Sequence, residues 1–389
     1  MTPASPTRAR LLPYGKQWVD DEDIAAVVET LRSDWLTTGP KVEEFERAFA
    51  AFTGAAHAVA VSNGTAALHA ATAALGIGPG DEVIIPAITF VASANCVVYQ
   101  GGTPVFADVE GDTLLIDPQD VEGKITARTK AVIAVDYAGQ PCDYEALRAI
   151  AARHKIALVA DACHALGGSY RGQPIGSLAD LSTFSLHPVK PITCGEGGVI
   201  TTNDAELAKA MRVFRSHGIS SDFRQREKQG SWAYEMVSLG YNYRLSDIQC
   251  ALAASQLKKL PTWVQRRQAI ARQYDEAFAG EARFTPLAVR DGVSHGYHLY
   301  VIRLGSGFDR GRFFQELRGE GIGANVHYAP VHMHPFYRRT FGTGPGLCPV
   351  AEAAYERILT LPIFPRMTDE DVADVITAVR RVATRLRSA

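Results

Sequence analysis

One lysine, Lys190, lies in a polar turn directly after the apolar run 181–186. A lysine amine with a lowered pKa can form a Schiff base with an aldehyde and can afterwards carry a proton between two carbon atoms. Earlier in the chain, Asp161 ends the apolar run 156–161. A buried carboxylate at such a place can keep a pyridine nitrogen protonated. The ordinary alternatives are a solvated loop lysine and an aspartate that caps the next helix.

A third polar segment, Ser62–Ala66, follows the apolar run 57–61 and precedes a helical pattern. Its amides and the Thr65 hydroxyl can hold a phosphate at the N-terminus of that helix. A plain strand-to-helix turn with a capping residue has the same composition. Open α/β sheets gather their ligands at the carboxyl ends of their strands, where all three segments are expected.

The elements that must position these residues alternate along the first two thirds of the chain. Short apolar runs are followed by helical patterns, which is typical of βαβ units. We therefore expect an α/β fold with a mostly parallel seven-stranded sheet between helices. The expected strands cover residues 57–62, 81–86, 103–109, 131–137, 156–161, 181–186 and 198–202, and the expected helices cover 20–32, 42–52, 67–75 and 91–99.

The pattern changes near residue 260, which predicts a large domain over 1–259 and a smaller α+β domain over 260–389. Pro261 is expected to open a long helix that ends at Phe278. Strand-like runs at 298–304 and 325–331, with a helix at 309–320, are expected to follow. Thr368 is expected to cap a final helix with a buried valine stripe.

Composition excludes several classes of protein. The formal net charge of -2 over 389 residues gives no basic field for nucleic acid. No apolar run is long enough to span a membrane or to serve as a signal peptide, so a cytoplasmic protein is expected. Six scattered cysteines without metal-ligand spacing predict reduced thiols, no disulfides and no metal site.

Taken together, these segments resemble the DegT/DnrJ/EryC1/StrS family of sugar-nucleotide aminotransferases, which are fold-type I enzymes that use pyridoxal 5'-phosphate (PLP). The resemblance runs in the family's order over nearly the whole chain. The stretches that match the family are 35–40, 62–68, 161–165, 184–190, 195–198, 240–244 and 327–332. Within the family, the stretches 135–139, 164–167 and 187–193 look closest to the C4 aminotransferases of the pseudaminic-acid pathway.

The resemblance implies a role for each matching residue around the cofactor. Lys190 would form the internal aldimine, Asp161 would pair with the pyridine nitrogen, and His164 would neighbour the phenolic oxygen of the ring. Phe90 would stack on the ring. The implied phosphate ligands are Thr65, Ala66 and Ser185, whose ordinary alternatives are capping or strand-end residues.

The resemblance also implies a homodimer in which Asn242 reaches the PLP phosphate of the partner. His327, Tyr328 and His332 match a stretch that lies near the sugar nucleotide in the family. By its type alone, Asn242 is a polar loop residue, and a strand histidine is commonly a core or surface group.

The implied reaction moves an amino group from L-glutamate, through pyridoxamine 5'-phosphate, to C4 of a UDP-linked 4-keto-6-deoxy-N-acetylhexosamine. Family members that act as dehydratases carry His where this chain has Lys190, which favours transamination. Alternatives are amination of a GDP-perosamine precursor or of a dTDP-linked 3- or 4-keto sugar, since pockets discriminate weakly between such substrates. A regulatory or sensory protein that binds a ligand without turnover is the remaining alternative.

Overall fold

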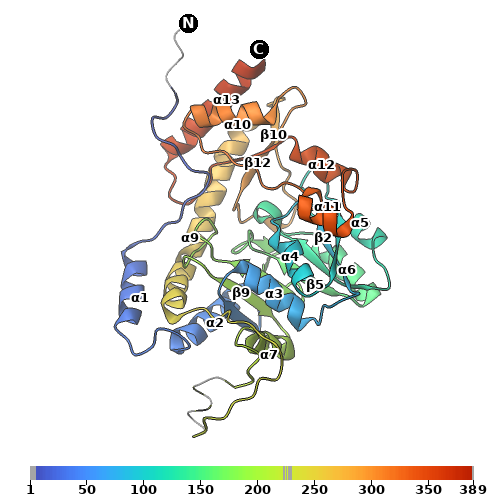
Figure 1. Ribbon diagram of the computed structural model, residues 1–389. Helices are drawn as coiled ribbons and strands as arrows, with labels where there is room; N and C mark the ends of the chain where they lie inside the picture. Colours follow the sequence, from blue (N-terminus) through green and yellow to red (C-terminus); the bar gives the residue numbers. More distant parts are fainter. Residues whose placement is uncertain (1–5, 222–223, 225, 227–229, 388–389) are drawn as a thin grey trace.

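The computed structural model describes residues 6–221, 224, 226 and 230–387 (Figure 1). Its centre is a seven-stranded sheet with the strand order β1-β9-β8-β5-β4-β2-β3. β9 is antiparallel to both neighbours and the remaining pairs are parallel, so the predicted mostly parallel sheet is confirmed. The strands are β1 (His57–Val61), β2 (Glu82–Pro86), β3 (Thr103–Ala107), β4 (Thr129–Val135), β5 (Ala157–Asp161), β8 (Leu181–Ser185) and β9 (Gly198–Thr202).

Helices cover this sheet because its strands are apolar on both faces. Val83, Ile84 and Ile85 are successive residues of β2, and none of them is exposed. The helices of this part are α1 (Asp21–Leu31), α2 (Pro40–Thr53), α3 (Gly64–Ala74), α4 (Ala92–Tyr99), α5 (Pro118–Gly123), α6 (Tyr144–His154) and α7 (Ala205–Phe214), with a 3-10 turn at Tyr137–Gly139.

The C-terminal part is built on a three-stranded antiparallel sheet, β10-β12-β13. Many of its buried residues form a second hydrophobic core, while others, such as Val301, Tyr337 and Ala351, belong to the core of the large sheet. A smaller sheet, β11-β6-β7, joins Val293–Ser294 to Ser169–Tyr170 and Gln173–Pro174. The other elements are β10 (Phe284–Pro286), β12 (Tyr300–Leu304), β13 (Ile358–Leu361), α10 (Arg310–Gly319), a 3-10 turn (Val331–Met333), α11 (Pro335–Phe341), α12 (Pro349–Tyr355) and α13 (Asp369–Arg387).

The long helix α9 (Asp247–Phe278) differs from the prediction that Pro261 opens it. It begins fourteen residues earlier, where Ser246 and Gln249 form a capping box. Pro261 lies at an exposed position of the helix, and packing of the other side against the two hydrophobic cores holds the helix together. The predicted boundary between residues 259 and 260 falls inside α9, and the division into two domains stays a prediction.

Two further segments differ from expectation. The stretch 325–331 is not a strand: Asn325 alone forms a bridge, to Thr360, and Pro330 lacks the N–H that a ladder needs. The helix α1 exists, but its apolar face points outward, with Ile24 53% and Leu31 54% exposed. Its buried residue Asp23 is held by three side chains of α9, those of Ser255, Gln256 and Lys259.

The final helix α13 follows the prediction closely. Thr368 Oγ1 accepts from the Asp371 amide at 3.1 Å, and the Asp371 carboxylate accepts from the Thr368 amide at 2.9 Å. No helix in the described part of the chain combines the length and the apolar composition needed to cross a bilayer.

Candidate active site

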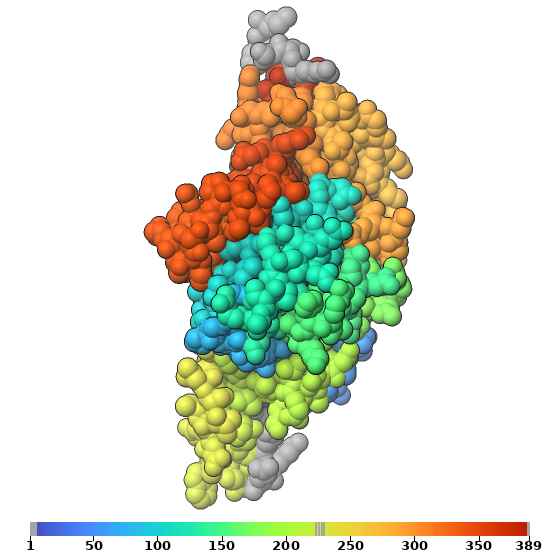
Figure 2. All heavy atoms as spheres, turned by 90° about the vertical axis from the view of Figure 1, so that its right-hand side faces the viewer, coloured from blue at the N-terminus to red at the C-terminus, as the bar shows by residue number. Residues whose placement is uncertain are grey.

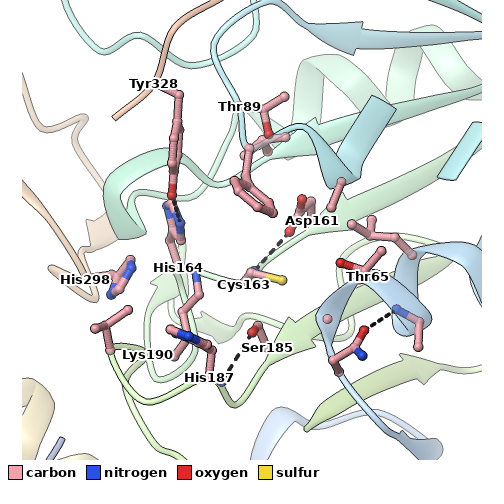
Figure 3. Close-up of a pocket in the computed structure, with 18 of the residues that line it drawn as sticks. Thr65, Thr89, Asp161, Cys163, His164, Ser185, His187, Lys190, His298 and Tyr328 are labelled. Carbon is pink, nitrogen blue, oxygen red and sulfur yellow. Dashed lines mark hydrogen bonds between the residues drawn. The ribbon is translucent and has the colours of Figure 1, made fainter. Parts of the chain in front are cut away.

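A cavity of about 770 Å³ opens at the carboxyl edge of the central sheet. Segments that follow β1, β2, β5 and β8 line one side, and segments of the C-terminal part line the other (Figure 3). The expected convergence of Ser62–Ala66, Asp161 and Lys190 is therefore present. The sequence brings them together because each follows a strand that points the same way.

Lys190 lies in the turn after β8, where its amide donates to the His187 carbonyl at 2.9 Å. Its side chain rises toward His164 and Cys163 (Figure 3). Burial lowers the pKa of the Lys190 amine, while the nearby Cys163 and Asp161 act in the opposite direction. A lowered pKa increases the fraction of neutral amine, which is the nucleophilic form.

Asp161 ends β5 and is almost fully buried. One carboxylate oxygen accepts from the Ser93 hydroxyl at 2.6 Å, and the other accepts from the Cys163 amide at 3.3 Å. The structure gives Asp161 no salt bridge with any of the residues it describes. A buried carboxylate held by hydroxyl and amide donors, without a cation, suits a ligand that brings its own positive charge.

The start of α3 forms the corner of the cavity that is expected to hold a phosphate group (Figure 3). Asn63 caps the helix by accepting from the Ala66 amide at 2.8 Å. Thr65 and Ser185 line the same corner. A Cβ added to Gly64 would lie 2.9 Å from Ser185 Cβ, so only glycine lets α3 start this close to β8. Amides at a helix start beside two hydroxyls are groups that can hold an anion.

Phe90 is an apolar side chain turned into the cavity, and it is 56% exposed. Its ring lies 6.0 Å from the ring of Tyr328. A large exposed aromatic ring on a cavity wall is well placed to stack on a planar ligand.

His164 also lines the cavity, with Nε2 3.2 Å from the Tyr328 hydroxyl (Figure 3). Its pKa lies well below the usual 6.5, first because the ring is buried and then because of the Lys190 and His327 charges. The imidazole is therefore neutral at neutral pH. The ring of His298 packs against it at 4.4 Å.

The three residues that were expected to contact the substrate do not all line the cavity. His327 and Tyr328 line the cavity. His332 does not: its ring is completely buried, and Nε2 lies 2.9 Å from a carboxylate oxygen of Glu352. This placement is that of a core histidine, the alternative already weighed, and substrate contact by His332 is not supported.

Asn242 lies outside the cavity and is exposed on the surface, with a bridge to Ser216. Its neighbour Tyr243 lines the cavity. The predicted role of Asn242 toward a partner subunit stays a prediction.

Several cavity residues were not identified from the sequence. His298 stands at the start of an expected strand, which was a usable signal for a site residue. Tyr14 carries no such signal, because it reaches the cavity from a segment without regular structure. The others are Leu68, Thr89, Ala92, Tyr99, Val135, Cys163, His187, Val189, Glu196 and Tyr243.

Comparison with known proteins identifies relatives over the whole chain. Spore coat polysaccharide biosynthesis protein SpsC of Bacillus subtilis is 44% identical over 380 residues, which cover 96% of this chain and 98% of SpsC. Spr1654 of Streptococcus pneumoniae is described as a candidate sugar aminotransferase, and its pyridoxamine 5'-phosphate (PMP) form is 36% identical to this chain. The two structures match with a TM-score of 0.92 over 96% of this chain and 100% of that one. Spr1654 is also solved in a PLP form.

Helicobacter pylori PseC, an aminotransferase involved in the biosynthesis of pseudoaminic acid, matches at 35% identity with a TM-score of 0.91, covering 97% of this chain and 100% of PseC. The cavity fits PLP: it offers an amine, an unpaired buried carboxylate, an anion corner and an exposed aromatic ring. The profile of the DegT/DnrJ/EryC1/StrS aminotransferase family matches residues 17–380. The chain belongs to that family and is a PLP-dependent sugar aminotransferase.

Proposed function

We propose that this enzyme transfers the amino group of L-glutamate to C4 of a UDP-linked 4-keto-6-deoxy-N-acetylhexosamine, giving UDP-4-amino-4,6-dideoxy-N-acetyl-altrosamine. The convergence of Lys190, Asp161 and the α3 corner on one cavity carries the aminotransferase part of this proposal. The likeness to PseC, an aminotransferase involved in the biosynthesis of pseudoaminic acid, supports a substrate from that kind of biosynthesis. Such a product belongs to the biosynthesis of pseudaminic-acid-type sugars.

Each proposed role follows from a position in the cavity. Bound PLP supplies an electron sink. Lys190 anchors the cofactor and moves a proton, and Asp161 balances the charge of its ring nitrogen. Thr65, Ala66 and Ser185 bind the phosphate.

The remaining roles belong to the walls of the cavity. Phe90 stacks on one face of the cofactor ring, and His164 binds its phenolic oxygen as a neutral imidazole. His327 and Tyr328 contact the sugar nucleotide from the C-terminal part.

We also propose a homodimer in which Asn242 reaches the phosphate site of the partner. An apolar strip over residues 231–241 supports it, since Trp232 is 89% and Leu239 76% exposed. Figure 2 shows this strip projecting at the lower end of the molecule. The outward apolar face of α1 is a second surface of this kind.

A substrate panel tests the proposal. Purified holoenzyme is given L-glutamate and, in turn, UDP-, GDP- and dTDP-linked keto sugars, and NMR identifies the carbon that receives nitrogen. We expect turnover to be fastest with the UDP-linked 4-keto-6-deoxy-N-acetylhexosamine, with nitrogen at C4. A preference for a GDP-linked or 3-keto sugar would show that the proposed substrate is wrong and that the protein is still an aminotransferase. Turnover with none of these sugars would exclude the proposed amino acceptor.

A further inference from the structure

Both ring nitrogens of His327 have hydrogen-bond partners, although the residue lines the cavity. Nε2 lies 3.3 Å from Asn325 Nδ2, and Nδ1 lies 2.9 Å from Thr360 Oγ1. Asn325 Oδ1 accepts from the Val326 amide at 2.8 Å, so the Asn325 amino group is the end that faces the ring. His327 Nε2 is therefore an acceptor. It follows that Nδ1 carries the proton and donates it to Thr360.

Thr360 is a rigid partner for this bond. It lies in β13 and is completely buried. Its amide donates to the Asn325 carbonyl at 2.7 Å, and the Asn325 amide donates to the Thr360 carbonyl at 3.1 Å. One strand residue thus fixes both the backbone next to His327 and the ring itself.

The His327 ring, which Thr360 holds, forms one wall of the cavity together with the rings of Tyr14 and Tyr328. Tyr14 lies 5.1 Å and Tyr328 lies 4.9 Å from the His327 ring, measured between ring centroids. The Tyr14 carbonyl accepts from the amide of Ile363, two residues after β13, at 3.0 Å. Because the His327 nitrogens are occupied, this ring offers its carbon faces to a ligand. Aromatic faces pack well against the C–H surface and methyl group of a deoxy sugar.

We infer that Thr360 is a positioning residue for the sugar-nucleotide half of the reaction, acting by accepting the hydrogen bond from His327 Nδ1 and so fixing the orientation of the ring. Thr360 does not line the cavity and touches no reacting atom. This inference rests on the proposed function, because it assigns the wall of Tyr14, His327 and Tyr328 to the sugar nucleotide. Under this inference, the His327 ring is a rigid contact surface for the sugar nucleotide and does not carry a proton in the reaction.

A pair of variants at one position tests it. Thr360→Val removes the acceptor at nearly constant volume, and Thr360→Ser keeps it. Thr201→Val is the matched control, because Thr201 is an equally buried strand residue whose hydroxyl bonds to the Gly176 carbonyl at 2.6 Å. Each holoenzyme is titrated with the UDP-linked 4-keto-6-deoxy-N-acetylhexosamine. Its half-reaction with L-glutamate is followed separately through the cofactor absorbance.

For Thr360→Val we expect KM for the sugar nucleotide to rise about tenfold, as for the loss of one buried hydrogen bond, with the glutamate half-reaction within about twofold of wild type. Thr360→Ser should stay within about threefold of the wild-type KM, and Thr201→Val should not change it. An unchanged KM in Thr360→Val, an equal loss in both half-reactions, or a failure of Thr360→Ser to restore KM would overturn the inference.

A spectroscopic reading separates this inference from the proposed function. In protein labelled with ¹⁵N in its histidine rings, the Nδ1–H proton of His327 should be slow to exchange with solvent in wild type, because it is bonded to Thr360, and should exchange faster in Thr360→Val. Equal exchange in the two proteins would rule out the assigned role. If wild type aminates no sugar at all, the proposed function fails, while the exchange of this proton still decides what Thr360 does to His327.

Discussion

At the scale of single residues, the chemistry depends on the partly buried position of Lys190. The cavity lowers the pKa of its amine and places it close to Asp161, Cys163 and His164. A carboxylate and a neutral imidazole near one amine give the site a charge distribution that suits a cofactor with a cationic ring nitrogen.

Replacing Lys190 by alanine should reduce turnover by a factor on the order of 10³ or more, because both the covalent anchor and the proton carrier are lost. The anion corner and Asp161 remain, so the variant should still hold PLP without a covalent bond. Turnover is measured with glutamate and a keto sugar, and retained cofactor by absorbance after gel filtration. Lys209→Ala, at an exposed helix position, is the control. Near-normal activity of Lys190→Ala would remove this lysine from its role.

His295 gives a prediction about stability and pH. Burial lowers the pKa of its imidazole to about 3, below the unfolded value of about 6.5. Between these values the unfolded chain binds a proton that the folded chain does not, so stability is lost as pH falls from about 6.5 toward 3. In His295→Asn, the free energy of unfolding should fall less steeply over this range, by up to about 1.4 kcal/mol per pH unit.

Chemical denaturation at a series of pH values measures this slope. His217→Asn is the control, since His217 is exposed and its left-handed backbone conformation accepts asparagine. Equal slopes for wild type and His295→Asn would contradict the prediction.

At the scale of elements, the start of α3 is the most sensitive point of the site. Gly64→Ala places a Cβ 2.9 Å from Ser185 Cβ, so either α3 or Ser185 must move. We expect a loss of about 1–3 kcal/mol in stability and weaker binding of PLP, because the phosphate corner widens. Thermal unfolding and cofactor titration measure the two effects. Gly78→Ala, where an added Cβ meets nothing within 4 Å, should change neither.

Much of the sheet and of the cofactor side of the site could be predicted from the sequence. Lys190, Asp161 and Thr65 follow strands whose apolar runs are unmistakable, and parallel strands bring their carboxyl ends to one edge. Tyr14 and Thr360 could not be predicted in this way. Tyr14 reaches the cavity, and Thr360 reaches the ring of His327, through tertiary packing of distant segments, which leaves no local pattern.

The errors have the same origin. Pro261 is a residue typical of a helix start, but tertiary packing stabilises α9 on both sides of it, so the helix continues through this position. The apolar spacing of α1 predicts a helix correctly but not which side faces the protein, because the buried polar residue Asp23 decides its orientation. His332 shares its sequence stretch with His327 but is turned into the core.

At the scale of the whole molecule, the exposed strip 231–241 predicts the oligomeric state. Wild type should sediment at twice the chain mass of 42.1 kDa. Leu239→Asp should shift the protein toward monomer, since a charge in an apolar interface has to be desolvated. Analytical ultracentrifugation measures this, with Leu347→Asp on another exposed surface as control. A wild-type monomer, or a Leu239→Asp dimer as tight as wild type, would exclude the strip as the interface.

The helix α9 has a consequence for how the molecule comes apart. Its first half places Leu257 and Leu260 in the core of the large sheet, and its second half places Ile270 and Tyr274 in the other core. If either core unfolded, one half of α9 would lose the contacts that stabilise it. The other core would then be destabilised as well, because it needs the remaining half of the same continuous helix. The two cores should therefore share a single cooperative melting event, and the walls of the cavity between them should separate only when the entire chain does.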